Sequence, residues 1–120
     1  MIFIVDDDAA TRESLRLLLE AEGFAAREFA AGTPFLQAVR PADGDCLILD
    51  INMPGKSGFE VMEELRRRGD EAPVIIVTAQ TDDATRARAI AAGASALLGK
   101  PRGADELLSV LRRVSTAPTS

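Results

Sequence analysis

The sequence has 120 residues, 47% of them hydrophobic, which suits one folded domain with a substantial core. A formal net charge of −5 argues against direct binding of nucleic acid or an anionic membrane by this domain, and the lack of histidine excludes histidine acid–base catalysis and histidine metal ligands. No apolar run would cross a bilayer and the first residues lack the features of a signal peptide, so we expect a cytoplasmic protein with protein partners. The single cysteine, Cys46, lies in an apolar run and is predicted to be buried and inert.

Short apolar runs alternate with amphipathic segments along the whole chain. The apolar runs predict strands over residues 1–5, 24–29, 46–49, 74–77 and 96–98. The segments between them predict helices over residues 9–22, 33–40, 59–68, 83–92 and 104–114. Thr33 followed by Pro34 predicts a capped start for the second helix, and Asp82 or Asp83 would cap the fourth.

Strict alternation of strands and helices predicts an α/β fold, a (βα)5 doubly wound domain with a parallel five-stranded sheet. Arg27 and Glu28 interrupt the second strand, whereas the first, third and fourth strands are almost purely apolar. The second strand is therefore predicted at an edge and the others at the centre. This predicts the flavodoxin-like order 2-1-3-4-5, with a ligand-binding crevice where the order reverses between strands one and three.

The last residues have a different composition from the rest of the chain. We predict a folded domain over residues 1–114, followed at 115–120 by a tract of small and polar residues with one proline. This tract is either a flexible tail or the start of a linker to a further domain.

Acidic residues follow two of the predicted central strands. Asp6, Asp7 and Asp8 follow the first strand, and Asp50 follows the third. Because the carboxyl ends of parallel strands share one edge of the sheet, these acids are expected to converge. Two carboxylates about 4 Å apart repel by roughly 4 kcal/mol at an effective dielectric near 20, so a divalent cation is expected between them. Mg²⁺ suits an all-oxygen site that keeps positions open for water and phosphate.

Two further residues at the same edge suit phosphoryl chemistry. Lys100 follows the fifth strand and Thr78 closes the fourth, where each would bind an oxygen of a phosphoryl group. Asp50 stands alone at the end of a central strand and is the predicted nucleophile, since an aspartate can form an acyl phosphate when cations hold the phosphoryl oxygens. Each residue taken singly is also explained as a helix cap, a turn or a surface residue; their combination favours the phosphoryl site.

Two other functions with this topology are less well supported by the sequence. A phosphohydrolase with an aspartyl nucleophile generally needs a second acid two residues downstream, where this chain has Asn52. A flavin-binding protein would need a phosphate-binding loop rich in glycine and hydroxyl groups, where this chain has Asp6 to Asp8.

The sequence resembles the receiver domain of two-component response regulators. The resemblance extends over residues 1–116 and rests on the motifs IVDDD at 4–8, LDINMPG at 49–55, VTA at 77–79, AGA at 92–94 and KP at 100–101. It implies a regulatory phosphoacceptor that catalyses only its own phosphorylation and dephosphorylation and changes conformation to control an output. The alternative is a phosphorylation-silent pseudo-receiver that acts as a protein-binding module.

The resemblance also assigns roles to individual residues. It implies that Asp50 accepts a phosphoryl group from a sensor histidine kinase or a phosphotransfer protein. Mg²⁺ would be held by Asp7, Asp50 and the backbone carbonyl of Asn52, with Asp6 nearby. The phosphoryl oxygens would be bound by Thr78, the backbone N–H of Ala79 and Lys100. Pro101 would hold the lysine through a bond that is typically cis in this family.

Further implications concern partners and signal transmission. Residues predicted to dock the kinase are Ala10, Thr11, Ser14 and Arg102. Leu97 occupies the position where receivers usually carry the aromatic switch partner of Thr78. Gly23-Phe24 and Phe35-Leu36 resemble the corresponding segments in the N-terminal receivers of helix-turn-helix transcription factors. This resemblance implies a DNA-binding output domain in the full-length protein. Homodimerisation on phosphorylation is also expected.

Overall fold

The computed structural model describes residues 1–100 and 104–116 and contains the predicted alternation of strands and helices. The strands are β1 (Ile2–Val5), β2 (Ala26–Phe29), β3 (Cys46–Leu49), β4 (Val74–Thr78) and β5 (Ala96–Gly99). The helices are α1 (Ala9–Ala21), α2 (Gly32–Ala38), α3 (Gly58–Arg67), α4 (Asp83–Ala91) and α5 (Ala104–Thr116). All strand pairs are parallel and the order is β2-β1-β3-β4-β5, which confirms the predicted flavodoxin-like topology.

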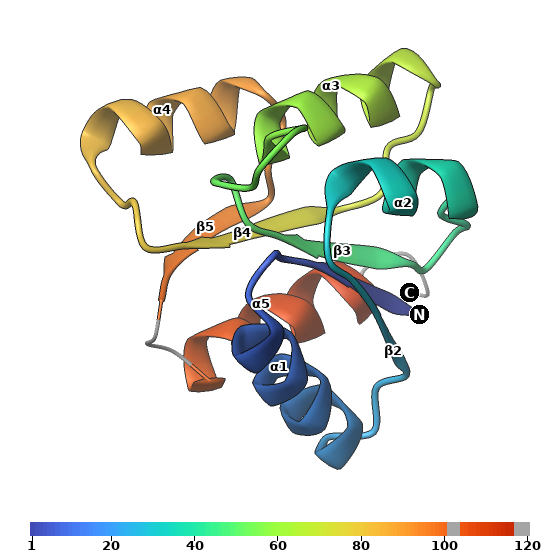
Figure 1. Cartoon of the computed structure of the whole chain (residues 1–120). Helices are drawn as coiled ribbons and strands as arrows, with labels where there is room; N and C mark the ends of the chain where they lie inside the picture. Colours follow the sequence, from blue (N-terminus) through green and yellow to red (C-terminus); the bar gives the residue numbers. More distant parts are fainter. Residues whose placement is uncertain (101–103, 117–120) are drawn as a thin grey trace.

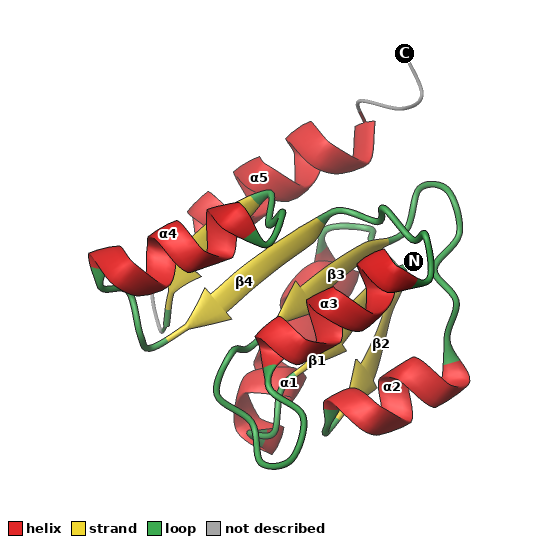
Figure 2. Ribbon diagram, turned by 90° about the horizontal axis from the view of Figure 1, so that it is seen from above, coloured by secondary structure: helices red, strands yellow, loops and turns green. Residues whose placement is uncertain are grey.

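Helices cover both faces of the sheet. In Figure 1, α2, α3 and α4 lie on one face and α1 and α5 on the other, and Figure 2 shows the same layers from above. Alternate residues of β3 enter the two cores: Leu47 and Leu49 pack toward α2, α3 and α4, whereas Cys46 and Ile48 pack toward α1 and α5. A strand covered on both sides is apolar along most of its length; β1, β3 and β4 are buried throughout, and Thr78 at the end of β4 is the one polar residue among them.

The edge strand β2 differs from the central strands as predicted. Its residues are half-buried except for the exposed Arg27. β2 begins at Ala26, later than predicted, because the preceding residues complete the end of α1. Gly23 has a φ of +91°, and the N–H of Phe24 donates to the carbonyl of Leu19.

Three helix starts among the described residues have side-chain caps. Asp8 caps α1, Ser57 caps α3 in a capping box with Glu60, and Asp82 caps α4. The predicted cap of α2 at Thr33 is wrong, because α2 starts at Gly32 after Ala31.

The start and end of α2 have clear physical reasons. Gly32, the first residue of α2, packs so close to Val61 that a Cβ would lie 2.4 Å from its methyl group, so a larger residue would displace Val61. Pro34 is tolerated because N–H groups in the first turn need no intrahelical acceptor. The helix ends at Ala38, before the predicted Arg40, because Val39 is extended.

Arginine side chains join α3 to α4 and the loops around them. The Arg66 guanidinium donates to the carbonyls of Asp70 (2.9 Å), Ala72 (3.2 Å) and Gly93 (3.3 Å), which holds together the loops that follow both helices. At the other end, the Arg88 guanidinium lies 4.1 Å from the ring centroid of Phe59. None of the helices in residues 1–100 and 104–116 is long and apolar enough to cross a membrane.

Helix α5 continues to Thr116, past the predicted end near Val114. Pro101, Arg102 and residues 117–120 lie outside the described residues, so the roles predicted for them stay predictions.

Candidate metal and phosphoryl site

The predicted functional residues meet where the strands end. Val5 pairs with Leu49 in the sheet, so Asp6 and Asp50, the residues that follow, leave neighbouring strands at the same edge. Thr78 closes β4 and pairs with Gly99, which precedes Lys100. The parallel sheet thus brings together residues that are far apart in the sequence, as the switch-point argument predicts.

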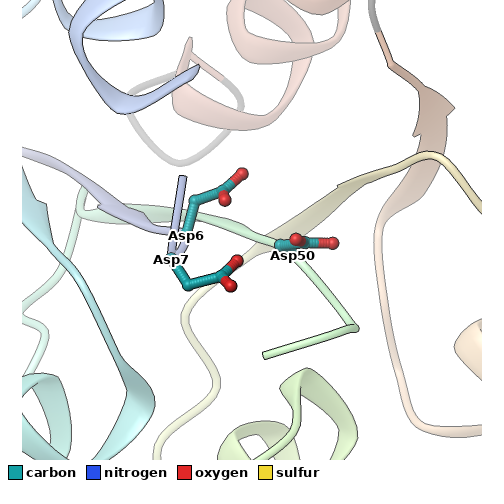
Figure 3. Close-up of side chains that lie close together, drawn as sticks. All are labelled: Asp6, Asp7 and Asp50. Atoms are coloured by element: carbon teal, nitrogen blue, oxygen red, sulfur yellow. The ribbon is translucent and has the colours of Figure 1, made fainter. Parts of the chain in front are cut away.

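Three carboxylates form a compact cluster at this edge. Single oxygens of Asp6, Asp7 and Asp50 all lie within 4.8 Å of one another. Figure 3 shows Asp6 and Asp7 extending from the end of β1, with Asp50 at the end of β3 beside them. Asp6 and Asp50 are only 2% and 7% exposed, whereas Asp7 is exposed to solvent. An all-oxygen donor set with one open side fits Mg²⁺, which binds through one or two carboxylates and keeps several waters.

Lys100 connects two of these carboxylates. Its Nζ lies 2.6 Å from Oδ2 of Asp6 and 3.2 Å from Oδ2 of Asp50. Burial would favour the neutral amine, but the hydrogen bonds and charges of the two aspartates outweigh it and raise the pKa of Lys100. Burial raises the pKa of Asp6, and the hydrogen bond from Lys100 opposes that rise. The lysine therefore stays charged and offsets part of the carboxylate repulsion.

The third acid of the N-terminal motif has a different role. Asp8 accepts hydrogen bonds from the Ala10 N–H (3.2 Å) and the Thr11 hydroxyl (2.6 Å), and the hydroxyl bond lowers its pKa. The N–H of Asp8 donates to Oδ1 of Asp6 at 2.9 Å. Asp8 thus fixes the start of α1 while its backbone orients the Asp6 carboxylate.

Thr78 lies at the base of the site and is fully buried. Its hydroxyl accepts a hydrogen bond from the backbone N–H of Gln80 at 3.2 Å, and its carbonyl accepts one from the backbone N–H of Lys100 at 2.9 Å. The predicted switch residue Leu97 is 7% exposed and belongs to the core beneath α3 and α4. Packing accounts for Leu97 in this structure, and its part in switching stays a prediction.

Asn52 and Gln80 connect the loops on either side of the site. The Asn52 side-chain amide donates to Oε1 of Gln80 at 3.1 Å, and the Asn52 backbone N–H lies 3.4 Å from Oδ1 of Asp50. Both side chains are exposed, so the hydrogen bond between Asn52 and Gln80 lies on the solvent side of the site.

The residues predicted to dock a kinase fall into three groups. Ala10 and Ser14 are exposed on α1 beside the acid cluster, which is compatible with docking. Thr11 is half-buried and its hydroxyl is bound to Asp8, so it has a structural role in the helix cap. Arg102 lies outside the described residues.

The sequence did not reveal several residues that support the site. Gly58 lies at the start of α3 and donates its N–H to the carbonyl of Ile51 at 2.9 Å; a Cβ on it would lie 2.4 Å from the carbonyl oxygen of Asp50. Arg12 reaches back from α1 to the carbonyl of Asp6 at 2.7 Å. The polar character of the β2 residue Glu28 indicated only an edge strand, although Glu28 also binds Arg12.

Comparison with known proteins agrees with this geometry. The family model described as "Response regulator receiver domain" matches residues 2–112. The chain is 37% identical over 111 residues to the transcriptional regulatory protein FixJ of Azorhizobium caulinodans, an alignment that covers 92% of this chain and 53% of FixJ. It is 38% identical over 111 residues to the response regulator MprA of Mycobacterium ulcerans, covering 92% of this chain and 48% of MprA.

A solved structure of the response regulator StyR superposes with a TM-score of 0.89 at 38% identity, covering 98% of this chain and 60% of StyR. The chain therefore spans about half the length of the curated relatives it matches. The family match, the parallel sheet with its reversal between β1 and β3, and the acid cluster beside Lys100 lead to the same conclusion: this chain belongs to the response regulator receiver domain family.

Proposed function

We propose that Asp50 accepts a phosphoryl group from the phosphohistidine of a sensor kinase or a phosphotransfer protein, in a Mg²⁺-dependent reaction. The observation that carries this proposal is the position of Lys100, whose amine lies between Asp6 and Asp50 next to a cluster of carboxylate oxygens within 4.8 Å. The phosphoacceptor thus has a cation beside it and two further acids within reach of the same metal ion.

In the proposed reaction, one carboxylate oxygen of Asp50 attacks phosphorus, the bond from phosphorus to the donor nitrogen breaks, and an acyl phosphate forms. When bound, Mg²⁺ would supply positive charge to the phosphoryl oxygens. The Lys100 amine would exchange its present carboxylate partners for a phosphoryl oxygen. The Thr78 hydroxyl uses a lone pair to accept from Gln80 and would donate its hydrogen to another phosphoryl oxygen. The backbone N–H of Ala79 would donate to a phosphoryl oxygen as well.

The metal ligands in this proposal are the Asp7 and Asp50 carboxylates and the backbone carbonyl of Asn52, with Asp6 acting through water. The burial of Asp6 and its bond to Lys100 favour this division, because Asp7 is the more exposed of the two acids. Pro101 would hold the Lys100 backbone, and Leu97 would repack when Thr78 moves toward the phosphoryl group.

The wider role is also a proposal. We infer that the receiver extends over residues 1–114 as a functional unit, that α5 continues it to Thr116, and that the following residues lead toward an output domain. A longer protein is supported by FixJ and MprA, of which this chain matches only about half. A DNA-binding output would suit the resemblance to FixJ, whose name is transcriptional regulatory protein. The full protein would then act in the cytoplasm and dimerise on phosphorylation.

The test is incubation with Mg²⁺ and acetyl phosphate, followed by mass spectrometry of the intact protein. We expect one phosphoryl group on the wild type, none on Asp50→Asn, and none when a chelator removes Mg²⁺. A receiver of known activity serves as the positive control. An unmodified wild type beside a modified control would contradict the proposal and favour the phosphorylation-silent pseudo-receiver.

Titration with Mg²⁺ separates an active receiver from a silent one by a second route. A ligand that binds only the folded state at 100 times its dissociation constant stabilises it by about 2.7 kcal/mol. We therefore expect the urea midpoint of the wild type to rise with Mg²⁺ and that of Asp7→Asn to stay constant. If the urea midpoint of the wild type does not change with Mg²⁺, this domain does not bind the metal.

A further inference from the structure

Both the N–H and the carbonyl of Asp6 are hydrogen-bonded, the first to the edge strand β2 and the second to an arginine that pairs with β2. Its N–H donates to the carbonyl of Phe29, the last residue of β2, at 3.1 Å. Its carbonyl accepts from Nη1 of Arg12, at the end of the first turn of α1, at 2.7 Å. A charged guanidinium donor makes this the stronger kind of hydrogen bond.

Arg12 is in turn oriented by Glu28, a residue of β2. Nε of Arg12 lies 3.3 Å from Oε1 of Glu28, and the two side chains are only 17% and 26% exposed. The other oxygen of Glu28 binds Nε of Arg16, whose Nη1 lies 3.1 Å from Glu20 on the same helix. Glu28 thus holds two arginines of α1, but of these the structure places only Arg12 on the carbonyl of Asp6.

The position of this carbonyl matters because of peptide geometry. The carbonyl of Asp6 belongs to the planar peptide unit that joins Asp6 to Asp7, both members of the acid cluster. A hydrogen bond that fixes the orientation of this plane therefore restricts the directions in which the two side chains leave the backbone. Glu28 also balances the charge of Arg12, so the guanidinium adds little net positive charge beside a cation site.

We propose that Arg12, oriented by Glu28, is a positioning residue for the Mg²⁺ site: it fixes the peptide between Asp6 and Asp7 and so preorganises the acid cluster for the metal. This inference rests on the proposed Mg²⁺ site. Residues that orient ligands from outside the coordination sphere typically change metal affinity by about 10- to 100-fold when they are replaced. A purely structural pair joining α1 to β2 would change stability and leave metal affinity unaltered.

The experiment is isothermal titration of Mg²⁺ into the wild type and a matched set of variants, with thermal melting by circular dichroism on each. Arg12→Gln removes the hydrogen bond to the Asp6 carbonyl. Arg16→Gln removes a positive charge of the same size that also pairs with Glu28, and it leaves the bond to Asp6 in place. The double variant Arg12→Gln/Glu28→Gln keeps the net charge of the wild type. Arg12→Lys keeps the charge and one donor group at the carbonyl.

We expect Arg12→Gln and the double variant to bind Mg²⁺ about tenfold more weakly than the wild type, with Arg16→Gln within about twofold and Arg12→Lys in between. Affinity within about twofold of wild type in the double variant, or an equal loss in Arg16→Gln, would overturn the positioning role while leaving the proposed function intact. Wild type that binds no Mg²⁺ would overturn both. If Arg12→Gln fails to fold, Arg12→Lys decides, since the proposal requires this variant to bind Mg²⁺ more weakly than the wild type while melting shows a folded protein.

Discussion

Replacing Gly58 with alanine tests how closely the start of α3 supports Asp50, the proposed phosphoacceptor. The added Cβ would lie 2.4 Å from the carbonyl oxygen of Asp50 and 2.8 Å from the Cα of Ile51, and real Cβ contacts are essentially never shorter than 3.0 Å. Both obstacles are backbone atoms, so no rotamer change can relieve the contact. Either α3 or the Asp50 peptide must move by about 0.6 Å or more, which is the difference between the 3.0 Å limit and the 2.4 Å contact with the Asp50 oxygen.

The expected loss of stability follows from two opposing effects. Overpacking of this kind costs about 1–3 kcal/mol, and an obstacle made of backbone favours the upper end of that range. Alanine recovers up to about 1 kcal/mol relative to glycine in a helix. We therefore expect the free energy of unfolding of Gly58→Ala to fall by about 2 kcal/mol in urea denaturation. A displacement of this size at Asp50, the proposed nucleophile, should also slow phosphorylation by acetyl phosphate about tenfold or more.

Gly99→Ala is the matched control at the same edge of the sheet. Its Cβ would lie 3.3 Å from the terminal methyl of Thr81, a side chain that can adjust, so its stability should change by less than about 1 kcal/mol. Wild-type stability and phosphorylation rate in Gly58→Ala would refute the steric argument, as would equal losses in both variants.

Three further predictions concern charge and titration. Lys100→Met removes the cation 3.2 Å from Asp50, so Mg²⁺ should bind about threefold tighter or more in calorimetry. The rate of phosphorylation by acetyl phosphate should fall at least about tenfold, because the variant lacks a cation for the phosphoryl oxygens. Weaker Mg²⁺ binding would contradict this electrostatic account. Burial raises the pKa of Cys46 to about 12, so iodoacetamide should label it only when urea unfolds the protein, and rapid labelling of the folded state would show the thiol to be accessible. Hydrogen bonds from Thr85 lower the pKa of Asp82, so its contribution to stability is complete above the unfolded value of about 3.9 and is lost as the pH falls toward the folded value. The difference in urea midpoint between wild type and Asp82→Ala should therefore shrink below about pH 4, and a constant difference would rule out the cap as its source.

The sequence predicted the central part of the fold because burial on two faces leaves a strong signal. The unbroken apolar run in β4 and the polar Arg27 in β2 were enough to separate centre from edge, and the reversal point then placed Asp50 beside the N-terminal acids. The convergence of Lys100 on Asp50 followed from strand order alone.

Features that depend on close packing or on the direction of a side chain could not be predicted in this way. The requirement for a small residue at Gly32 depends on its approach to Val61, a contact between elements distant in sequence. The role of Arg12 depends on a side chain that turns back along its helix, whereas helical periodicity marks only which face a residue occupies. The Thr33-Pro34 pair predicted a capped helix start at Thr33, whereas α2 begins one residue earlier without a side-chain cap.

The backbone hydrogen bond from Lys100 to Thr78 has a consequence for biosynthesis. A ribosome releases the acids of β1 and β3 well before the residues that complete the site, and chains grow at about 5–20 residues per second. A nascent chain therefore carries Asp50 for several seconds before the amine of Lys100, which lies beside it in the folded domain, is available. Under the proposed function, modification by a phosphodonor would be restricted to chains whose synthesis has passed β5, because only these carry Lys100 beside Asp50.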